Sequence, residues 1–291
     1  MFKIRVPATS ANLGPGFDCL GIALGLYNTF EVEPYHKLML EGVEKRFANE
    51  ENLFMKAFRT SGGTGGLHVK FHYDIPISRG LGSSASLYTA GALSAMALNE
   101  TYDRDELFRI VSSLEGHPDN AAPAVYGGLT ASMSGRKGWV ASQLPLNENL
   151  RFTVLVPDFE VETSDAVSIL PDSYPRGVAS GNAAKAVFMT EALRLGDIEM
   201  LRDAARDQLH EPYRKTLIPN FETVKAITEN DTGGALVISG SGSTCLLISD
   251  RPLSSSAMLS VMTLPEHWAV QELPVSSGPE YAEDDLWQAI I

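Results

Sequence analysis

Cysteine is almost absent from this chain of 291 residues, which contains only Cys19 and Cys245. Two cysteines cannot form a disulfide framework and no C-x-x-C motif is present, so the sequence indicates a reducing, cytoplasmic compartment. Long apolar runs are absent as well, because no stretch approaches the roughly 20 residues that a membrane span requires. Residues 1–10 lack the apolar core of a signal peptide. We therefore expect a cytoplasmic protein with no membrane partner.

Basic residues are scarce: 23 Lys and Arg stand against 36 Asp and Glu, a formal net charge of −13. A strongly acidic chain repels DNA and RNA at long range, so we expect no nucleic-acid partner. An anionic ligand would need a local site of backbone N–H groups and a few cations. The contents of 44% hydrophobic and 20% charged residues are those of a globular protein and exclude a disordered or collagen-like chain.

Strand and helix patterns are mixed along the chain without the strict alternation of a doubly wound sheet, which favours an α+β fold. The predicted strands are residues 2–6, 27–33, 67–73, 151–157, 234–239 and 244–249. The predicted helices are residues 84–98, 103–115, 182–195, 197–209 and 221–229. Residues 7–18 are rich in turn formers, and the tail of residues 278–291 has no clear pattern. A polar stretch at 145–149 divides the chain into expected domains of residues 1–150 and 151–291.

The most informative segment follows a predicted strand and opens a predicted helix. It consists of Pro76, Ile77, Ser78, Arg79, Gly80, Leu81, Gly82, Ser83, Ser84, Ala85 and Ser86. Its glycines allow a tight turn and close approach to a ligand, and the first-turn N–H groups of the helix form an anion site. The segment is not a Walker A loop, since it lacks Gly-Lys-Ser/Thr. We expect this segment to bind a phosphate group, and a helix-capping turn without a ligand is the alternative.

The same segment also matches G-x-G-x-x-A, with Glu100 twenty residues after Gly80. This spacing is that of a dinucleotide-binding fingerprint, which would indicate an NAD-dependent oxidoreductase. Glu100 falls at the end of a predicted helix rather than after a second strand, so the fingerprint lacks its βαβ context. We therefore place this interpretation last.

Three other segments carry polar side chains that suit either chemistry or turns. Residues 114–123 contain Glu115, His117, Asp119 and Asn120 within six positions, and a carboxylate there could hold Mg²⁺ together with a serine hydroxyl and phosphate oxygens. In residues 12–18, Asn12 and Asp18 bracket Gly14-Pro15-Gly16. Residues 240–243 read Gly-Ser-Gly-Ser between two apolar strands. Taken singly, residues 114–123 are equally typical of a structural turn, and the other two segments favour a structural turn over a functional site.

Taken together and in this order, the four segments resemble the motifs of the GHMP small-molecule kinases. Residues 76–86 are similar to the family's phosphate-binding loop, P-x-x-x-G-L-G-S-S-A. Residues 7–18 and 115–124 are very close to the form found in the members that phosphorylate homoserine. The resemblance implies an N-terminal ATP-binding domain with ribosomal-protein-S5-like topology, a ferredoxin-like C-terminal domain and a site between them. It also implies ATP-dependent phosphorylation of L-homoserine to O-phospho-L-homoserine, a step of threonine biosynthesis.

Residue roles follow from the resemblance position by position. ATP would bind residues 76–86, with Asn52 near the adenine, and Ser84 and Glu115 would hold Mg²⁺. The L-homoserine pocket would consist of Asn12, Asp18, His117, Asn120 and Arg214. We expect direct attack by the substrate hydroxyl, oriented by Asn120 and helped by Asp18. Members of the family are often dimeric, so the resemblance leaves a homodimer open.

One departure from the family pattern concerns the substrate carboxylate. The family usually has a second arginine in a T-x-x-A-R segment, and here Val167 stands at that position. We expect weaker homoserine binding, or a substitute cation such as Arg176 or Lys185. The departure keeps two alternatives open, a sister kinase for another small alcohol and a nucleotide-binding homologue without catalysis.

Overall fold

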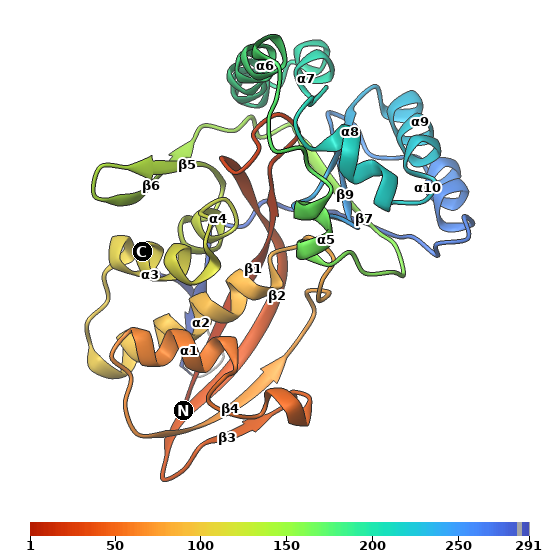
Figure 1. Cartoon of the computed structure of the whole chain (residues 1–291). Coiled ribbons are helices and arrows are strands. Elements are labelled where there is room, and N and C mark those ends of the chain that lie inside the picture. The colour runs from red at the N-terminus through yellow and green to blue at the C-terminus, as the bar shows by residue number, and fades with distance from the viewer. Residues whose placement is uncertain (284–286, 291) are drawn as a thin grey trace.

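The computed structural model describes residues 1–283 and 287–290, which form two β-sheets with helices packed against them (Figure 1). The first sheet has the strand order β12-β11-β1-β2-β4-β3, with β5 joined to β2 and β6 joined to β5. Its strands are β1 (Phe2–Ala11), β2 (Leu20–Tyr35), β3 (Met39–Glu41), β4 (Gly66–His72), β5 (Leu129–Gly135), β6 (Gly138–Leu144), β11 (Glu280–Ala282) and β12 (Gln288–Ala289). The predicted α+β class is confirmed.

Strands β1 and β2 form one long antiparallel ladder from Phe2–Val32 to Ala11–Gly21, with a register shift after Pro7. The prediction ended the first strand at residue 6 and began the second at residue 27, so both strands are longer than predicted. The added part of β1 is polar in sequence but buried, because Thr9 and Ser10 are fully enclosed and bonded to other segments. Only the true turn, after Ala11, remains irregular.

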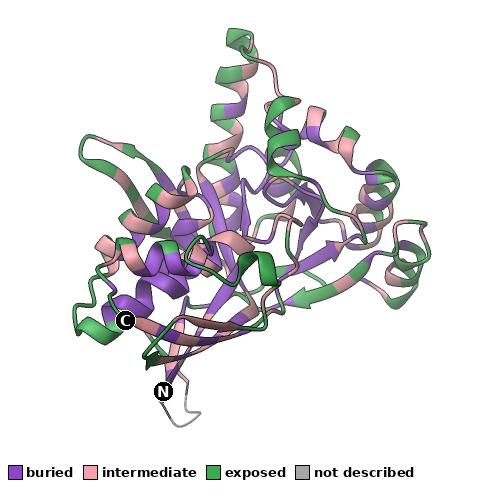
Figure 2. Ribbon diagram, turned by 60° about the horizontal axis from the view of Figure 1, so that its bottom comes forward, coloured by how far each residue is buried: buried purple, intermediate pink, exposed green. Residues whose placement is uncertain are grey.

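Four helices cover one face of the first sheet, and Figure 2 shows the buried inner side that they share with the strands. They are α1 (Leu53–Thr60), α2 (Ser83–Asn99), α3 (Arg104–Glu115) and α4 (Ala121–Tyr126), with a short 3-10 helix η1 (Lys45–Phe47) before them. Helix α2 is buried on most sides, and its alanines and Gly91 permit this. A Cβ at Gly91 would lie 2.0 Å from the Phe54 carbonyl oxygen, so α1 and α2 pack with their backbones almost in contact. The predictions for α2 and α3 are confirmed.

The second sheet is antiparallel, with the order β10-β7-β9-β8. Its strands are β7 (Arg151–Val156), β8 (Ala235–Ile238), β9 (Cys245–Ser249) and β10 (Ala269–Leu273). The helices of this half are α5 (Thr163–Ser168), α6 (Arg176–Leu195), α7 (Ile198–Ala204), α8 (Glu211–Arg214), α9 (Phe221–Thr232) and α10 (Ser255–Met262), with η2 (Lys215–Leu217). Strand–helix–strand–strand–helix–strand succession in this order is the ferredoxin-like arrangement. The predicted hairpin around residues 240–243 is confirmed.

The predicted helix over 197–209 is wrong in its second half, because α7 ends at Ala204. The carboxylate of Asp207 accepts the N–H groups of Leu209, His210 and Glu211, and it therefore holds a turn that starts α8. An Asp side chain that bonds the following backbone in this way competes with helix continuation.

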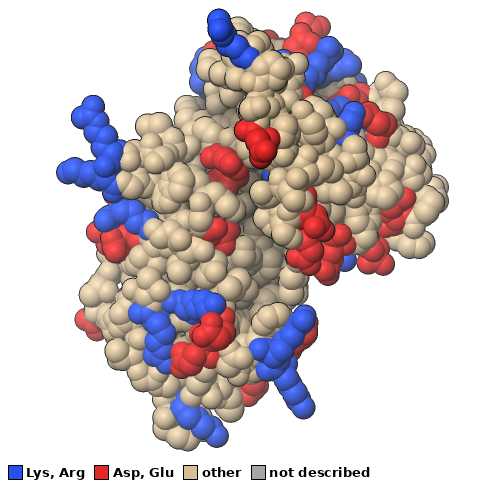
Figure 3. Space-filling view, viewed as in Figure 1, with Lys and Arg blue, Asp and Glu red and all other residues tan. Residues whose placement is uncertain are grey.

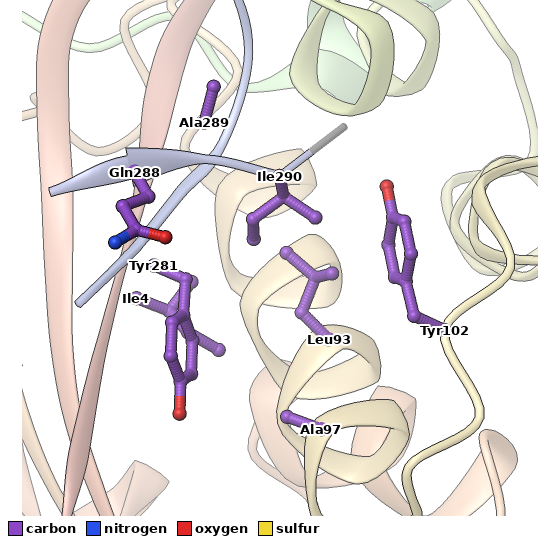
Figure 4. A pocket seen from close by; sticks show the side chains of 8 residues that line it. All are labelled: Ile4, Leu93, Ala97, Tyr102, Tyr281, Gln288, Ala289 and Ile290. Carbon is purple, nitrogen blue, oxygen red and sulfur yellow. The ribbon is translucent and has the colours of Figure 1, made fainter. Parts of the chain in front are cut away.

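The C-terminal segment returns to the first sheet, where β11 pairs with β1 and β12 pairs with β11. Arg5 anchors it through a 2.6 Å ion pair with Glu280. Between this segment, β1 and α2 lies an apolar cavity of about 250 Å³. Leu93 and Ala97 of α2 face Ile290 across it (Figure 4). Part of the tail without a predicted pattern, residues 284–286 and 291, lies outside the described residues.

The boundary that we placed at residue 150 lies between β6 of the first sheet and β7 of the second, and it stays a prediction. None of the described helices combines the length and hydropathy of a membrane span.

Candidate active site

Four consecutive carbonyl oxygens of the loop before α2 accept hydrogen bonds from distant parts of the chain. The carbonyls of Ser78, Arg79, Gly80 and Leu81 accept from the Val161 N–H at 3.3 Å, the Thr244 N–H at 3.1 Å, the Ser239 hydroxyl at 2.6 Å and the Thr9 N–H at 3.1 Å, respectively. These donors come from β1 and from two segments of the C-terminal half, the β8–β9 hairpin and the chain around Val161. The loop conformation therefore depends on both halves of the molecule.

Gly80 and Gly82 are required by this packing. Both have positive φ, 74° and 66°, where residues with a Cβ are disfavoured. A Cβ at Gly80 would lie 2.1 Å from the Ser239 carbonyl oxygen, and one at Gly82 would lie 1.8 Å from the Thr9 hydroxyl. The two glycines thus permit contact with the hairpin and with β1.

The N-terminus of α2 suits a bound anion. Its N-cap, Gly82, supplies no side-chain bond, so no cap side chain satisfies the first-turn N–H groups of this 17-residue helix. Uncapped N–H groups and the helix dipole attract phosphate, and half-buried Ser83 and Ser84 can add hydroxyls. The phosphate groups of a nucleotide fit this cradle.

Other residues of the loop have structural contacts. Ser86 is buried, donates to the Ser83 carbonyl at 2.7 Å and accepts from Asn28 at 2.9 Å. Asn28 Oδ1 also accepts hydrogen bonds from the N–H groups of Asp74 and Ile75, and so fixes the chain that enters the loop.

The remaining side chains of residues 76–86 differ in exposure and contacts. Arg79 turns toward the C-terminal half, where Nη1 donates to the Pro157 carbonyl at 3.1 Å and Nη2 lies 3.8 Å from Asp158. Ile77 is exposed, Pro76 is half-buried, and Ala85 packs in the core.

Ser84 and Glu115 lie together beside the helix N-terminus. Burial raises the pKa of the Glu115 carboxyl, and a hydrogen bond from Ser84 partly offsets this. No cluster of three His, Cys, Asp or Glu side chains suited to a metal occurs in the described part of the chain. A hydroxyl and a carboxylate next to a phosphate cradle are nevertheless the oxygen donors that Mg²⁺ takes when phosphates complete its shell.

The turn at residues 12–18 meets the hairpin of the C-terminal half. Asn12 donates through Nδ2 to the Gly240 carbonyl at 2.9 Å, and its Oδ1 accepts the Asp18 N–H at 3.0 Å. Arg214 donates to the same Gly240 oxygen at 2.9 Å, to the Ala166 carbonyl at 3.1 Å, and lies over the Phe17 ring. The sequence motifs around Asn12 and Arg214 are therefore adjacent in space.

Asp18 projects from this turn near groups of both charges. Burial and the charge of Asp119 raise the pKa of its carboxyl, while His117 and Arg214 act in the opposite direction. A carboxylate and a guanidinium whose charges influence each other match the two charges of an amino acid.

His117 is paired with Asp119, whose role the sequence analysis missed. Nδ1 of His117 donates to the Asp119 carboxylate at 2.9 Å, and this bond raises the pKa of His117 to about 9. Asp119 is buried and also accepts the N–H of Asn120. The Thr9 hydroxyl donates to Asn120 Oδ1 at 2.7 Å, which leaves the amide nitrogen of Asn120 for a ligand.

Three positions named in the sequence analysis, Asn52, Val167 and Lys185, have other surroundings. Asn52 caps α1, accepting the Phe54 N–H at 2.9 Å and donating to the Phe47 carbonyl at 3.0 Å. Val167 lies on α5 next to Ala166, with 57% of its surface exposed. Lys185 donates to the Arg206 carbonyl on the α6–α7 side.

Sequence analysis also missed Thr9, Ser10, Ser239 and Asn28. Polar residues inside otherwise apolar strand patterns are the signal that could have found the first three. In the space-filling view a hollow lies between the lobe of α1–α4 and the lobe of α5–α10, with acidic side chains on both sides (Figure 3). The four motifs meet where these lobes join.

This fold and site define a two-lobed small-molecule kinase. Residues 49–128 match the family described as GHMP kinases N terminal domain, and residues 189–263 match GHMP kinases C terminal. The chain belongs to the GHMP kinase family, and the fold predicted from the resemblance is confirmed.

Within this family the chain is similar to homoserine kinases. A homoserine kinase of Clostridium botulinum strain ATCC 19397 is 39% identical over 94% of this chain and 96% of its own. One from strain Eklund 17B is 36% identical over 86% and 87%, respectively. The crystal structure of homoserine kinase from Cytophaga hutchinsonii superposes with a TM-score of 0.84 at 26% identity, covering 97% of each chain.

The order of elements also removes the dinucleotide interpretation. Glu100 is the C-cap of α2, and the next element is helix α3 rather than a strand. The βαβ unit that an NAD site requires is therefore not formed there.

Proposed function

We propose that this chain is a kinase that uses ATP to phosphorylate L-homoserine, giving O-phospho-L-homoserine for threonine biosynthesis. One observation carries the proposal. The Gly240 carbonyl accepts hydrogen bonds from both Asn12 and Arg214, while the hydroxyl of the adjacent Ser239 donates to the Gly80 carbonyl in the loop before α2. The turn of residues 12–18 and the anion cradle are thus both attached to one hairpin. Similarity to homoserine kinases over nearly the whole chain supports the same assignment.

In this proposal the phosphates of ATP bind the N–H groups of residues 80–85 at the start of α2. Ser84 and Glu115 hold Mg²⁺, which neutralises charge on the phosphoryl group during transfer. Asn52 would act near the adenine by fixing the start of α1, because both ends of its carboxamide bond the backbone.

L-homoserine would bind across the turn of residues 12–18. Asp18 pairs with its ammonium group and Arg214 with its carboxylate. Asn12 and His117 line the same pocket. The free amide nitrogen of Asn120 donates to the substrate hydroxyl oxygen and orients it, since Thr9 fixes the other end of this side chain.

The chemistry that we propose is in-line transfer. The substrate hydroxyl oxygen forms a bond to the terminal phosphorus as the bond to ADP breaks, and the hydroxyl proton is released. Positioning and electrostatic stabilisation supply most of the catalysis in such reactions. The raised pKa of Asp18 suits a group that assists proton removal. If Asp18→Asn lowers kcat only a few-fold, with its main effect on the KM for L-homoserine, a role as base is excluded.

The test is ADP release from ATP and Mg²⁺ with L-homoserine, mevalonate, galactose and shikimate offered separately. We expect turnover with L-homoserine alone. Turnover with another alcohol would support the assignment as a kinase and would contradict the assignment of the pocket to L-homoserine. Nucleotide binding without any turnover would identify a homologue that has lost catalysis.

Two further statements belong to the proposal. We place the protein in the cytoplasm, consistent with its two free cysteines, one of them buried. The resemblance leaves a homodimer open, and light scattering on the purified chain decides between one and two copies.

A further inference from the structure

The turn that presents Asn12 and Asp18 has an unfavourable backbone. Asn12, Leu13 and Gly14 have successive φ values of 72°, 45° and 71°, and Asp18 has 53°. Left-handed conformations are disfavoured for residues with a Cβ, so a run of this kind persists only where surrounding contacts impose it.

Two buried side chains from the C-terminal half make those contacts. His210 Nε2 bonds the Gly14 carbonyl at 2.9 Å, and Asn182 Nδ2 donates to the Pro15 carbonyl at 2.9 Å. Both side chains are almost completely enclosed. The backbone of Ala205 also approaches closely, because a Cβ on Gly14 would lie 3.2 Å from its carbonyl oxygen.

The protonation of His210 follows from its surroundings. A carbonyl oxygen can only accept, so Nε2 carries the proton. Burial lowers the pKa of His210, with neighbouring Arg214 acting in the same direction and Asp207 in the other, so the ring is a neutral donor.

Both donors are themselves held in place. The His210 ring stacks on Phe17 with centroids 5.3 Å apart, and the backbone N–H of His210 donates to the Asp207 carboxylate at 2.7 Å. Asn182 Oδ1 accepts the Gln208 N–H at 3.0 Å, which ties α6 to the segment before α8. Neither side chain belongs to the loop that forms the anion cradle.

We propose that His210 and Asn182 are positioning residues for the amino-acid substrate, acting through the Gly14 and Pro15 carbonyls on the turn that carries Asn12 and Asp18. This inference rests on the proposed function. It places control of homoserine affinity in the C-terminal half, while ATP affinity depends on the separate loop before α2.

The experiment compares the variants His210→Phe, His210→Gln and Asn182→Ala with the unchanged chain. Phenylalanine keeps a ring against Phe17 and loses the donor, whereas the glutamine amide can replace Nε2. We expect His210→Phe and Asn182→Ala to raise the KM for L-homoserine about tenfold, the scale of one lost hydrogen bond to a buried carbonyl. The KM for ATP should stay within about twofold of the unchanged chain, and His210→Gln should restore most of the homoserine affinity.

His68→Phe is the matched control, because it removes the bonds from β4 to Glu33 of β2 and Glu41 of β3 without contacting the turn. It should lower the melting temperature and leave both KM values unchanged. If His210→Phe does not fold, Asn182→Ala carries the same expectation.

An unchanged homoserine KM in the folded variants, or an equal rise in both KM values, would overturn the positioning role. If the unchanged chain itself fails to phosphorylate L-homoserine, the proposed function fails and this inference with it. The two failures are therefore distinguished by the unchanged chain.

Discussion

The hydroxyl oxygen of Ser239 lies 2.6 Å from the carbonyl oxygen of Gly80, and it also lies 2.8 Å from the hydroxyl of Ser10. One buried side chain thus joins the β8–β9 hairpin, the loop before α2 and strand β1. Because these segments carry the glycine-rich loop and flank the substrate turn, Ser239 connects the two parts of the site.

Removing this hydroxyl should weaken nucleotide binding. In Ser239→Ala the Gly80 carbonyl loses a donor in a buried setting, which costs about 1–3 kcal/mol. We expect the KM for ATP to rise about tenfold, with a smaller change for L-homoserine, in steady-state assays. Ser241→Ala is the control, since its hydroxyl bonds only within the hairpin. An equal KM for ATP in Ser239→Ala and Ser241→Ala would show that the Ser239 hydroxyl does not hold the loop before α2.

Glu115→Gln should change the dependence on Mg²⁺. The amide keeps the size of the side chain and removes the charge that a hard cation requires. We expect the Mg²⁺ concentration for half-maximal activity to rise by about tenfold or more, as measured by titration at saturating ATP. Glu100→Gln, at the exposed end of α2, should leave the titration unchanged. An unaltered Mg²⁺ dependence in Glu115→Gln would remove this residue from the metal site.

Arginine at position 167 should strengthen substrate binding. Val167 is exposed on α5, and the adjacent Ala166 carbonyl receives Arg214, so a longer side chain has room close to the proposed carboxylate partner. A charged hydrogen bond contributes about 1.5–3 kcal/mol. Val167→Arg is expected to lower the KM for L-homoserine about tenfold, whereas Val187→Arg, on exposed α6, changes nothing. No fall in KM would refute the prediction that this pocket lacks a second cation beside Arg214.

The His117–Asp119 pair should make the folded protein less stable as the pH becomes alkaline. The folded-state pKa of His117 is raised from 6.5 to about 9, chiefly by the hydrogen bond to Asp119. A raised folded-state pKa means that the stabilisation is complete below pH 6.5 and is lost as the pH rises through about 9.

We therefore expect the melting temperature in metal-free buffer to fall between pH 7 and 10 more steeply in the unchanged chain than in His117→Gln. His36→Gln, an exposed histidine, should behave as the unchanged chain. Parallel pH profiles for His117→Gln and the unchanged chain would exclude a stabilising pair.

Local sequence patterns predicted the elements that neighbouring residues specify. The start of α2 after Gly82, the length of α3 and the hairpin around residues 240–243 were all predictable, because glycine-rich turns and apolar periodicity act over a few residues. The extension of β1 through Ala11 was not predictable, since the polar Thr9 and Ser10 belong to the strand only through distant partners. Likewise Asp207, a residue inside a helical pattern, ends the helix by a side-chain contact.

The sequence by itself determined the chemical inventory of the site: a glycine- and serine-rich loop for an anion, a carboxylate at Asp18, a guanidinium at Arg214, and the family to which these belong. Only the tertiary structure decided which groups share a pocket and which serve as supports. Asn12 and the Gly240 carbonyl are 228 positions apart yet 2.9 Å from each other. Such contacts depend on the packing of whole sheets and helices, whereas sequence patterns report interactions within one turn of chain. For the same reason His210 and Ser239 acquire their roles only when the two lobes meet.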